Sequence, residues 1–435
     1  GGFDGLKQYS QMKNSGIEWI GEIPEEWKIQ KLKHVCIKIV DGVHKTPEYE
    51  NSGIPFISVN NFTRGKLDFS KTKFISKNSH IQLIKRCNPE KDDLILSKIG
   101  TLGQVDVIEN EFEFSIFVQL ALLKLNKEKL IPIFLKYFLK SNLIQIQIIL
   151  FSNQTTLKYI GINDIELLPV FIPSMNEQKQ IVSYLDKKTK TIDDEITKNQ
   201  NLIKLLQEKR QSEINHAVTK GLDDTVPMKD SGIEWIGEIP KHWNIMKLKR
   251  LVNLSQGIQI PEDKQIDEEE KGYVRFLRIV DFTDNAKSRF VNKFDNNSFL
   301  EKDEIVMIRY GASAGKVLRG LKGVFANNMF KLISNYLLTN NFLFDFLNQQ
   351  LVQDHITEMS PVTTMPNINH NIVYDLNIPL PPLNEQKQIT NFIYSKTTKI
   401  DSLISKIQLQ ISKLQEFRES LISSAVTGKI KVAQA

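Results

Sequence analysis

Two long segments of the chain carry hydrophobic residues at alternating steps of four and three, the period of helices that pack through a and d positions. The first segment, 176–218, contains neither proline nor glycine, and its pattern returns 208 residues later. Pro173 and Pro382 precede the two predicted helices, and Gly221 and Gly428 end them. The residues expected to pack between the helices are Leu185, Ile192, Ile196, Ile203 and Leu206 in the first and Ile393, Ile400, Ile404, Ile411 and Leu414 in the second.

Much of the remaining sequence is also duplicated. The segment KNSGIEWIGEIPE at 13–25 returns as KDSGIEWIGEIPK at 229–241, and NEQKQI at 176–181 returns at 384–389. The offset between the copies changes only between about residues 35 and 134 and is constant at 208 afterwards. One part of each copy has therefore varied in length, while the other has kept a fixed length.

The duplication predicts how the two helices pair. Each would be about 60 Å long at ~1.5 Å per residue, and we expect them to pack antiparallel and to hold two globular units a fixed distance apart. A homodimerising coiled coil is the alternative. Asn199 aligns with Ile407, and this asymmetry favours pairing within one chain, because a polar residue at such a position often specifies the partner. The N-terminal tail resembles the segment after the first helix, so we expect it where the second helix ends.

Each globular unit combines β-rich runs with apolar helical patterns. We therefore predict an α+β fold: two α+β domains in a pseudo-two-fold arrangement, separated by two long antiparallel coiled-coil helices. The expected strands are Phe56–Val59 with Val274–Val280 and Asp93–Ser97 with Glu304–Ile308, and the expected helical stretches are 130–150 and 338–357.

Composition narrows the functional classes without choosing one. Lys and Arg outnumber Asp and Glu by 57 to 51, a formal charge of +6 that permits nucleic-acid binding without requiring it. Cys36 and Cys87 form neither a CxxC pair nor a disulfide framework, and no apolar run approaches the ~20 residues of a membrane span. We expect a reducing, cytoplasmic setting without a membrane.

The segments that resemble catalytic or nucleotide-binding motifs are incomplete. GASAGKV at 311–317 is one residue short of a phosphate-binding loop and ends in Val where Ser or Thr would bind magnesium. Asn88-Pro89-Glu90 lacks the residues that complete an adenine methyltransferase motif, and the seven histidines show no metal-ligand spacing. We expect no catalytic residue, no metal site and no cofactor bound by this chain.

The chain resembles the specificity subunits of Type I restriction–modification enzymes. The resemblance rests on SGIEWIGEIP opening each copy, on the strand-then-glycine segments SKIGTLGQV and IRYGASAGKV, and on IPSMNEQKQI and IPLPPLNEQKQI opening the long helices. These motifs cover nearly the whole chain, in the right order, twice. The resemblance implies two target-recognition domains, each reading one half of an interrupted DNA sequence. The differing variable segments imply an asymmetric target.

The resemblance also implies partners. Two methyltransferase subunits would bind the helices, a restriction motor and nuclease subunit would join them, and S-adenosylmethionine would be bound by the methyltransferase. The setting would be the bacterial or archaeal cytoplasm, close to the nucleoid. The implied domains are 1–15 (a segment closing the ring of repeats), 16–170 (target recognition), 171–222 (spacer helix), 223–231 (linker), 232–378 (target recognition) and 379–430 (spacer helix).

Candidate DNA-binding residues are the polar and basic side chains of the segments that vary in length, because such side chains read base edges and hold phosphates. For each, a solvated surface role is the alternative. The recurring pairs Thr155-Thr156 and Thr363-Thr364 could hold phosphate or a loop. The candidates are Lys45, Thr46, Tyr49, Ser58, Asn60, Asn61, Arg64, Lys98, Thr101 and Gln104 in the first copy and Gln256, Gln259, Arg275, Arg278, Arg309, Tyr310, Ser313 and Lys316 in the second.

Two alternatives remain open. Trp19 and Trp235 in the repeated SGIEWIGEIP segment could anchor the local core or contact a partner. The whole protein could instead be a coiled-coil scaffold whose globular ends bind protein. DNA binding would weaken steeply with salt, whereas a scaffold would bind DNA weakly or not at all.

Overall fold

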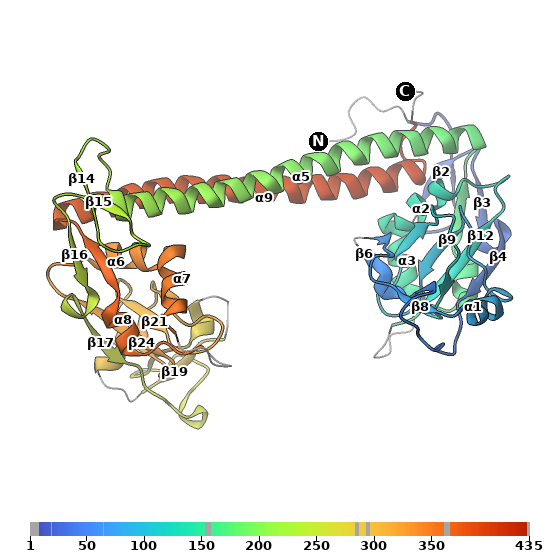
Figure 1. The fold of residues 1–435 in the computed structure, drawn as a ribbon. Helices are drawn as coiled ribbons and strands as arrows, with labels where there is room; N and C mark the ends of the chain where they lie inside the picture. Colours follow the sequence, from blue (N-terminus) through green and yellow to red (C-terminus); the bar gives the residue numbers. More distant parts are fainter. Residues whose placement is uncertain are drawn as a thin grey trace. The chain divides into compact units, whose positions relative to one another are not determined.

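A computed structural model gives the fold as two compact units. Unit 1 comprises Gly1–Asn199 and Leu409–Ala435, and unit 2 comprises Gln200–Gln408. Each unit combines sheets with helices, which confirms the predicted α+β class (Figure 1). The structure describes residues 8–18, 20–63, 65–152, 158–282, 287–292, 296–360 and 366–432.

The central sheet of unit 1 is buried on both faces. Leu94 and Leu96 of its second strand face one hydrophobic cluster, and Ile95 between them faces another. A sheet covered on both sides needs apolar side chains at successive positions, which explains the unbroken LIL run. The strands are antiparallel, in the order β10 (Val105–Val107), β9 (Leu94–Ser97), β12 (Leu120–Leu125) and β4 (Cys36–Asp41).

Two short helices cover one face of this sheet. The helical stretch expected at 130–150 is divided in two at Ser141, whose extended backbone (ψ 142°) ends α2 (Pro132–Lys140) and precedes α3 (Asn142–Phe151). A second sheet, β11 (Ser115–Ile116), β5 (Ile54–Ile57) and β8 (Lys73–Ile75), lies beyond the other cluster. The remaining elements of unit 1 are β1 (Met12–Asn14), β2 (Glu22–Pro24), β3 (Lys28–Lys31), β6 (Phe62–Thr63), β7 (Lys66–Leu67), α1 (Lys77–Ile84), α4 (Ile162–Leu167) and β13 (Pro169–Ile172).

Unit 2 repeats this plan with its own side chains. Its central sheet has the order β17 (Val252–Gln256), β24 (Met329–Ser334), β21 (Ile305–Ile308) and β22 (Val317–Leu318), and its second sheet has the order β19 (Arg289–Val291), β18 (Val274–Leu277), β23 (Gly323–Phe325) and β20 (Phe299–Leu300). The other elements are β14 (Met228–Asp230), β15 (Glu238–Pro240), β16 (Asn244–Lys247), α6 (Asn340–Leu347), α7 (Gln350–Glu358), α8 (His370–Asp375) and β25 (Asn377–Leu380).

The two long helices are present as predicted. They are α5 (Met175–Lys220) and α9 (Leu383–Val426). Each contributes one half to each unit, and within a unit the two halves lie side by side (Figure 1). Two contacts show that the helices run antiparallel in unit 1. Asp193 of α5 pairs with Arg418 of α9. Sixteen residues earlier in α5, Glu177 is joined through Tyr9 to Lys431, which lies beyond the end of α9.

The predicted packing residues differ in burial along the helices. Those nearest the globular parts are the most enclosed: Leu185, Ile192, Ile393 and Ile400 are buried. The packing residues farther from the globular parts are half-buried. They are Ile196, Ile203, Leu206, Ile404, Ile411 and Leu414.

The repeated Asn-Glu-Gln sequence anchors each long helix to its unit. In unit 1, the fully buried Gln178 accepts from the Ile131 backbone N–H and donates to the backbone carbonyls of Lys129 and Pro173. In unit 2, Gln386 makes the same three kinds of bond with Thr339, Leu337 and Pro381.

The preceding glutamate holds a tryptophan in each unit. Glu177 accepts from the Trp27 indole at 3.0 Å, and Glu385 accepts from the Trp243 indole at 3.0 Å. Both indoles are almost fully buried. The sequence reasoning chose Trp19 and Trp235 as anchors and missed this second tryptophan of each repeat. Trp235 packs against the core of unit 2, and Trp19 lies outside the described residues.

The two ends of the chain meet in unit 1. Lys429, just after α9, donates to the backbone carbonyls of Ile20 and Glu22. The N-terminal segment thus lies where the second long helix ends. Lys220 and Glu238 form the equivalent contact in unit 2, within the continuous chain.

Candidate nucleic-acid interface

Each unit places a basic residue directly after the second strand of its central sheet. In unit 1 this residue is Lys98, and its Nζ lies 3.3 Å from Oδ2 of Asp41, the last residue of β4. Both side chains are less than 10% exposed. Arg86 and His44 also contact Asp41. Burial raises the pKa of Asp41, but these three cationic or basic groups outweigh it and hold the pKa below its usual value.

Unit 2 builds the same position with different chemistry. Arg309 follows β21, and its Nη1 donates at 2.6 Å to Oε1 of Gln256, the last residue of β17. The guanidinium lies 4.8 Å from the centre of the Tyr310 ring. In the described part of unit 2, no carboxylate forms an ion pair with Arg309.

Several buried polar atoms around Arg309 have no hydrogen-bond partner among the described residues. They are Nε of Arg309 itself, Oδ1 of Asn328 and Nε2 of His370. Burial lowers the pKa of His370, and the positive charge of Arg309 lowers it further. Buried polar groups in folded proteins are normally paired, so this group of atoms needs an explanation.

Other predicted residues of unit 2 surround this cluster. Gln259 is exposed and accepts from the exposed Asn327, while Gln256 donates to the Asn327 carbonyl. Lys316 is exposed on the hairpin that follows Arg309, and Ser313 is half-buried there. The structure thus brings together six of the eight candidates of this unit, Gln256, Gln259, Arg309, Tyr310, Ser313 and Lys316.

The hairpin itself is held in the same way in both units. Gln353 of α7 donates to the Gly315 and Leu347 carbonyls. In unit 1, Gln145 of α3 donates to the Gly103 and Leu139 carbonyls. Each hairpin is therefore fixed to the helix beside it, which gives its polar side chains a defined position.

The remaining two candidates of unit 2 are used in a turn. Arg275 and Arg278 both pair with Asp281, whose side chain is fully buried. Asp281 also accepts a hydrogen bond from the Arg278 backbone N–H. The strand expected at Val274–Val280 therefore ends at Leu277, and a 3-10 turn follows it. Both guanidinium groups are therefore engaged by one carboxylate inside the unit.

Unit 1 forms the same turn with neutral side chains. Asn61 accepts from the Ser58 backbone N–H at 2.9 Å and donates to the Asp68 carbonyl. Asn61 is buried and Asn60 beside it is exposed. Ser58 and Asn61 have fewer polar atoms left for DNA than Asn60 has.

The other candidates of unit 1 lie on its surface or outside the described residues. Lys45 and Thr46 are exposed. Tyr49 is also exposed, and Lys73 lies 4.1 Å above its ring. Arg64 and the pairs Thr155-Thr156 and Thr363-Thr364 are outside the described residues.

Thr101 and Gln104 line a cleft of about 1100 Å³ in unit 1. Its walls also carry Lys66, Lys136 and Lys140 from the globular part, with acidic and basic residues of α5 and α9 opposite. Burial lowers the pKa of Lys140 to about 8, and its neighbour Lys136 adds to this effect. Sequence reasoning did not find Lys136 and Lys140, because α2 carries them within an apolar helical pattern.

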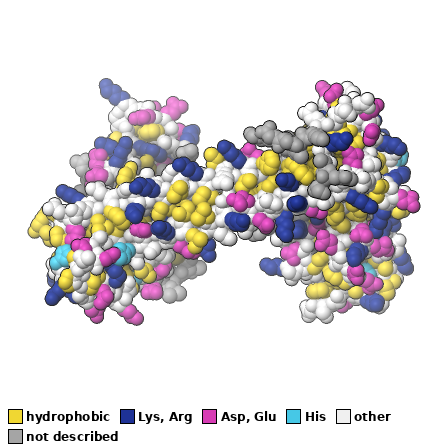
Figure 2. All heavy atoms as spheres, turned by 90° about the horizontal axis from the view of Figure 1, so that it is seen from above, with side chains coloured by type: hydrophobic (Ala, Val, Ile, Leu, Met, Phe, Trp, Pro, Cys, Tyr) yellow, Lys and Arg dark blue, Asp and Glu magenta, His cyan; other side chains and the backbone are white. Residues whose placement is uncertain are grey.

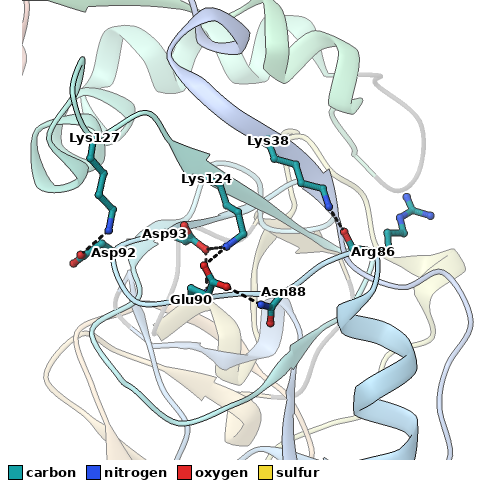
Figure 3. A network of polar contacts seen from close by, with 8 residues as sticks. All are labelled: Lys38, Arg86, Asn88, Glu90, Asp92, Asp93, Lys124 and Lys127. Atoms are coloured by element: carbon teal, nitrogen blue, oxygen red, sulfur yellow. Dashed lines mark hydrogen bonds and ion pairs between the residues drawn. The ribbon is translucent and has the colours of Figure 1, made fainter.

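The Asn88-Pro89-Glu90 segment has a structural role (Figure 3). Lys124 of β12 bonds Glu90 and the buried Asp93 at 2.8 Å each, and Asn88 donates to Glu90 at 2.8 Å. Lys127 and Asp92 form a further pair at 2.9 Å. These contacts fix the loop against the central sheet of unit 1.

Surface charge is mixed. On the face that Figure 2 shows, Lys and Arg side chains alternate with Asp and Glu. Hydrophobic side chains also gather along the helical stretch in this view. Within unit 2, Leu202 and Leu205 of α5 and Leu403 of α9 are 44–60% exposed. Exposed leucines in such a row are typical of a surface that another protein covers.

Among the described residues, no group of three or more His, Cys, Asp or Glu side chains could hold a metal ion. No single described helix is apolar and long enough to span a membrane, although α2 and α3 together, bent by 70°, meet the length and composition requirement.

Comparisons with known proteins agree with the repeated architecture. Residues 24–205 and 240–413 match the family model described as the Type I restriction modification DNA specificity domain. The putative type I restriction enzyme MjaX specificity subunit of Methanocaldococcus jannaschii is 26% identical over 98% of this chain and 99% of its own length. The StySPI specificity subunit of Salmonella potsdam is 23% identical over 94% of this chain and 90% of its own.

Solved structures show the same fold. A chain from work on complex assembly and conformational transition of the type I R-M system has a TM-score of 0.75 at 15% identity, covering 94% of this chain and 99% of the other. The HsdS subunit from Thermoanaerobacter tengcongensis has a TM-score of 0.55 at 15% identity, covering 94% and 98%. The family resemblance inferred from the repeated motifs is confirmed.

Proposed function

The chain belongs to the Type I restriction modification DNA specificity family, and from this premise we propose that it recognises an asymmetric DNA target made of two separated half-sites. Unit 1 reads one half-site and unit 2 reads the other. The long helices carry the enzymatic subunits of the complex and set the length of the unread gap.

The observation that carries this proposal is the strand-end position built twice with different side chains. Lys98 and Asp41 occupy it in unit 1, and Arg309 and Gln256 occupy it in unit 2. The scaffold around it is the same, because the Gln145 and Gln353 clamps hold the two hairpins alike. One fold that carries a closed ion pair at this position in one unit and a guanidinium on a neutral amide in the other would present different surfaces to DNA, as the reading of two different sequences requires.

The exposed leucines of α5 and α9 support a partner on the helices. Two methyltransferase subunits would cover these helices and supply S-adenosylmethionine and its chemistry, and restriction motor and nuclease subunits would join them. A methyltransferase takes the target base out of the stack before it reacts. In the complex, this chain would contribute recognition only.

The test is to co-express the chain with its methyltransferase subunit and to map adenine methylation across the host genome. We expect one interrupted, asymmetric motif that appears only when both proteins are present. A stable complex that methylates no DNA would favour the alternative of a protein-binding scaffold. Binding to DNA that does not weaken as salt increases would also contradict the proposal.

A further inference from the structure

The Arg309 site of unit 2 differs from its unit 1 counterpart in how its charge is balanced. Lys98 is within 3.3 Å of the Asp41 carboxylate, whereas Arg309 is bonded to the neutral amide of Gln256. An ion pair that is already complete has little to gain from DNA. A guanidinium held by a neutral side chain keeps its full charge and its remaining donors.

Two further positions of the two sites also differ. Arg309 N–H bonds the Asn328 carbonyl, as Lys98 N–H bonds the Gln119 carbonyl, so Asn328 and Gln119 occupy equivalent positions in the turn before the neighbouring strand. Ile368 N–H bonds the Arg309 carbonyl, as Ile160 N–H bonds that of Lys98. Two residues beyond these isoleucines stand His370 in unit 2 and the apolar Ile162 in unit 1.

The backbone bond from Arg309 to the Asn328 carbonyl places Asn328 beside Arg309, just beyond the ends of β24 and β21. His370 is close enough to Arg309 for the positive charge of the guanidinium to lower the pKa of the imidazole. One buried polar atom of each has no hydrogen-bond partner among the described residues. A ligand that satisfies them must accept hydrogen bonds from Arg309 and donate one to Oδ1 of Asn328.

We propose that the Arg309–Asn328 pair of unit 2 reads a guanine–cytosine base pair through the major groove, an assignment that rests on the function proposed above. Guanine presents two acceptors, N7 and O6, to the guanidinium, and the paired cytosine presents its N4 amino group as a donor to Asn328. A phosphate would satisfy Arg309 but offers only acceptors, so it would leave Asn328 Oδ1 without a donor. Gln256 and the Tyr310 ring hold the guanidinium in position before DNA binds.

The proposal is tested in the complex with the methyltransferase, on a DNA library that is randomised over both half-sites. Arg309→Lys replaces the rigid planar fork of donors with a flexible ammonium, so we expect discrimination to fall roughly 10-fold at one G·C position. That position should lie in the half-site read by unit 2, and the other half-site should be unchanged. Lys302→Ala, an exposed lysine of unit 2 outside the candidate set, serves as the matched control.

A second variant covers the case in which Arg309→Lys does not fold, which thermal melting would show. Asn328→Ala should relax the same base pair. Uniform loss of affinity for all sequences, with the slope of log affinity against log salt reduced by about one, would identify a phosphate contact and overturn the proposal. Unchanged profiles for both folded variants would overturn it as well. If the unsubstituted complex yields no motif, it is the proposed function that fails.

Discussion

Arg418 of α9 donates from Nη2 to Oδ2 of Asp193 on α5 at 3.2 Å. Unit 2 contains the same pair with the helices exchanged, because Arg210 of α5 donates from Nε to Oδ1 of Asp401 on α9 at 3.0 Å. Both arginines and both aspartates are 208 residues apart, the offset of the repeated helices. The two pairs therefore fix the same antiparallel register in each unit.

These pairs should contribute little to stability. Their side chains are 35–53% exposed, and exposed ion pairs are worth about 0.2–1 kcal/mol. A double-mutant cycle with Arg418→Met and Asp193→Asn, measured by urea denaturation, should give a coupling energy in that range. The cycle on Arg210 and Asp401 is the internal control. A coupling above about 2 kcal/mol in either cycle would contradict the exposed geometry.

Gln178 should contribute far more to the free energy of unfolding than the polar residues next to it in α5. Gln178→Ala would leave the Ile131 N–H and the carbonyls of Lys129 and Pro173 without their partner. An unsatisfied buried group costs about 1–3 kcal/mol, so we expect a loss of at least ~2 kcal/mol in the free energy of unfolding. Lys179→Ala, one residue along and exposed, should change it by less than about 0.5 kcal/mol.

An effect of Gln178→Ala no larger than that of Lys179→Ala would show that water replaces the lost bonds. The equivalent change in unit 2, Gln386→Ala, should repeat the result, since that side chain makes the same set of bonds.

The sequence was sufficient to predict the elements that repeat. The 208-residue offset and the apolar seam predicted α5 and α9. The matched β-rich runs predicted β9 and β21 of the central sheets and β5 and β18 of the second sheets. It could not predict the breaks at Ser141 and Gln349, because both residues are compatible with a helix and only the tertiary packing makes them extended.

Lys98 is expected to act in stability rather than in reading DNA. Asp41→Asn would leave a buried lysine without its carboxylate, and breaking such a pair costs about 3–5 kcal/mol. Lys98→Met should cost less, because Arg86 and His44 still balance Asp41. Thermal and urea denaturation would measure both changes.

Arg309→Met is the control in unit 2 for these stability measurements. The partner of Arg309 is the neutral Gln256, so the substitution leaves no charge unpaired. It should therefore destabilise the protein less than Asp41→Asn. A Lys98→Met variant of normal stability with a relaxed first half-site would reverse the roles assigned to these residues.

Lys98 and Arg309 also show what the sequence could not reveal about the site. Both stand directly before the repeated strand-then-glycine hairpin, and both were selected as basic candidates. Their difference depends on Asp41 and Gln256, which lie about 50 residues away and belong to the part of the chain whose length varies. Only the pairing of β4 with β12 and of β17 with β24 brings these residues to their partners.

Asp345 should make stability depend on pH. Burial raises its pKa to about 6, against the opposing effects of Arg319 and Arg210. In the unfolded chain the carboxyl titrates near 4, so between about pH 4 and 6 the folded state binds more protons. The stabilising contribution is complete below pH 4 and is lost as the pH rises through about 6.

Asp345→Asn isolates this effect from other titrating groups. The difference in free energy of unfolding between the variant and the unchanged protein should shift in favour of the variant as the pH rises from 4 to 7. Urea denaturation at several pH values would measure it. A difference that stays constant over this range would mean that Asp345 titrates normally.

The last prediction concerns the length of the helices. Residues 198–204 of α5 and 407–413 of α9 lie midway along each helix between its residues of the Asp193–Arg418 and Arg210–Asp401 pairs. Deleting both segments removes one heptad from each helix, which keeps the a and d seam in phase, and it shortens the pair by about 10 Å at ~1.5 Å per residue. DNA rises about 3.4 Å per base pair, so the gap between half-sites should become shorter by roughly one to three base pairs.

The shortening of the gap is limited because the helix and the DNA rotate by different angles when they are shortened. Removing a heptad turns one end of a helix by only about 20°, whereas three base pairs of DNA turn by roughly 100°, so the DNA must twist to use the shortest gap. We therefore expect reduced methylation at a shorter gap, with both half-site sequences unchanged, in the genome-wide map. Deleting only 198–204 shifts the register of one helix and should abolish folding or assembly. Altered half-site sequences in the double deletion would mean that the helices do not set the spacing.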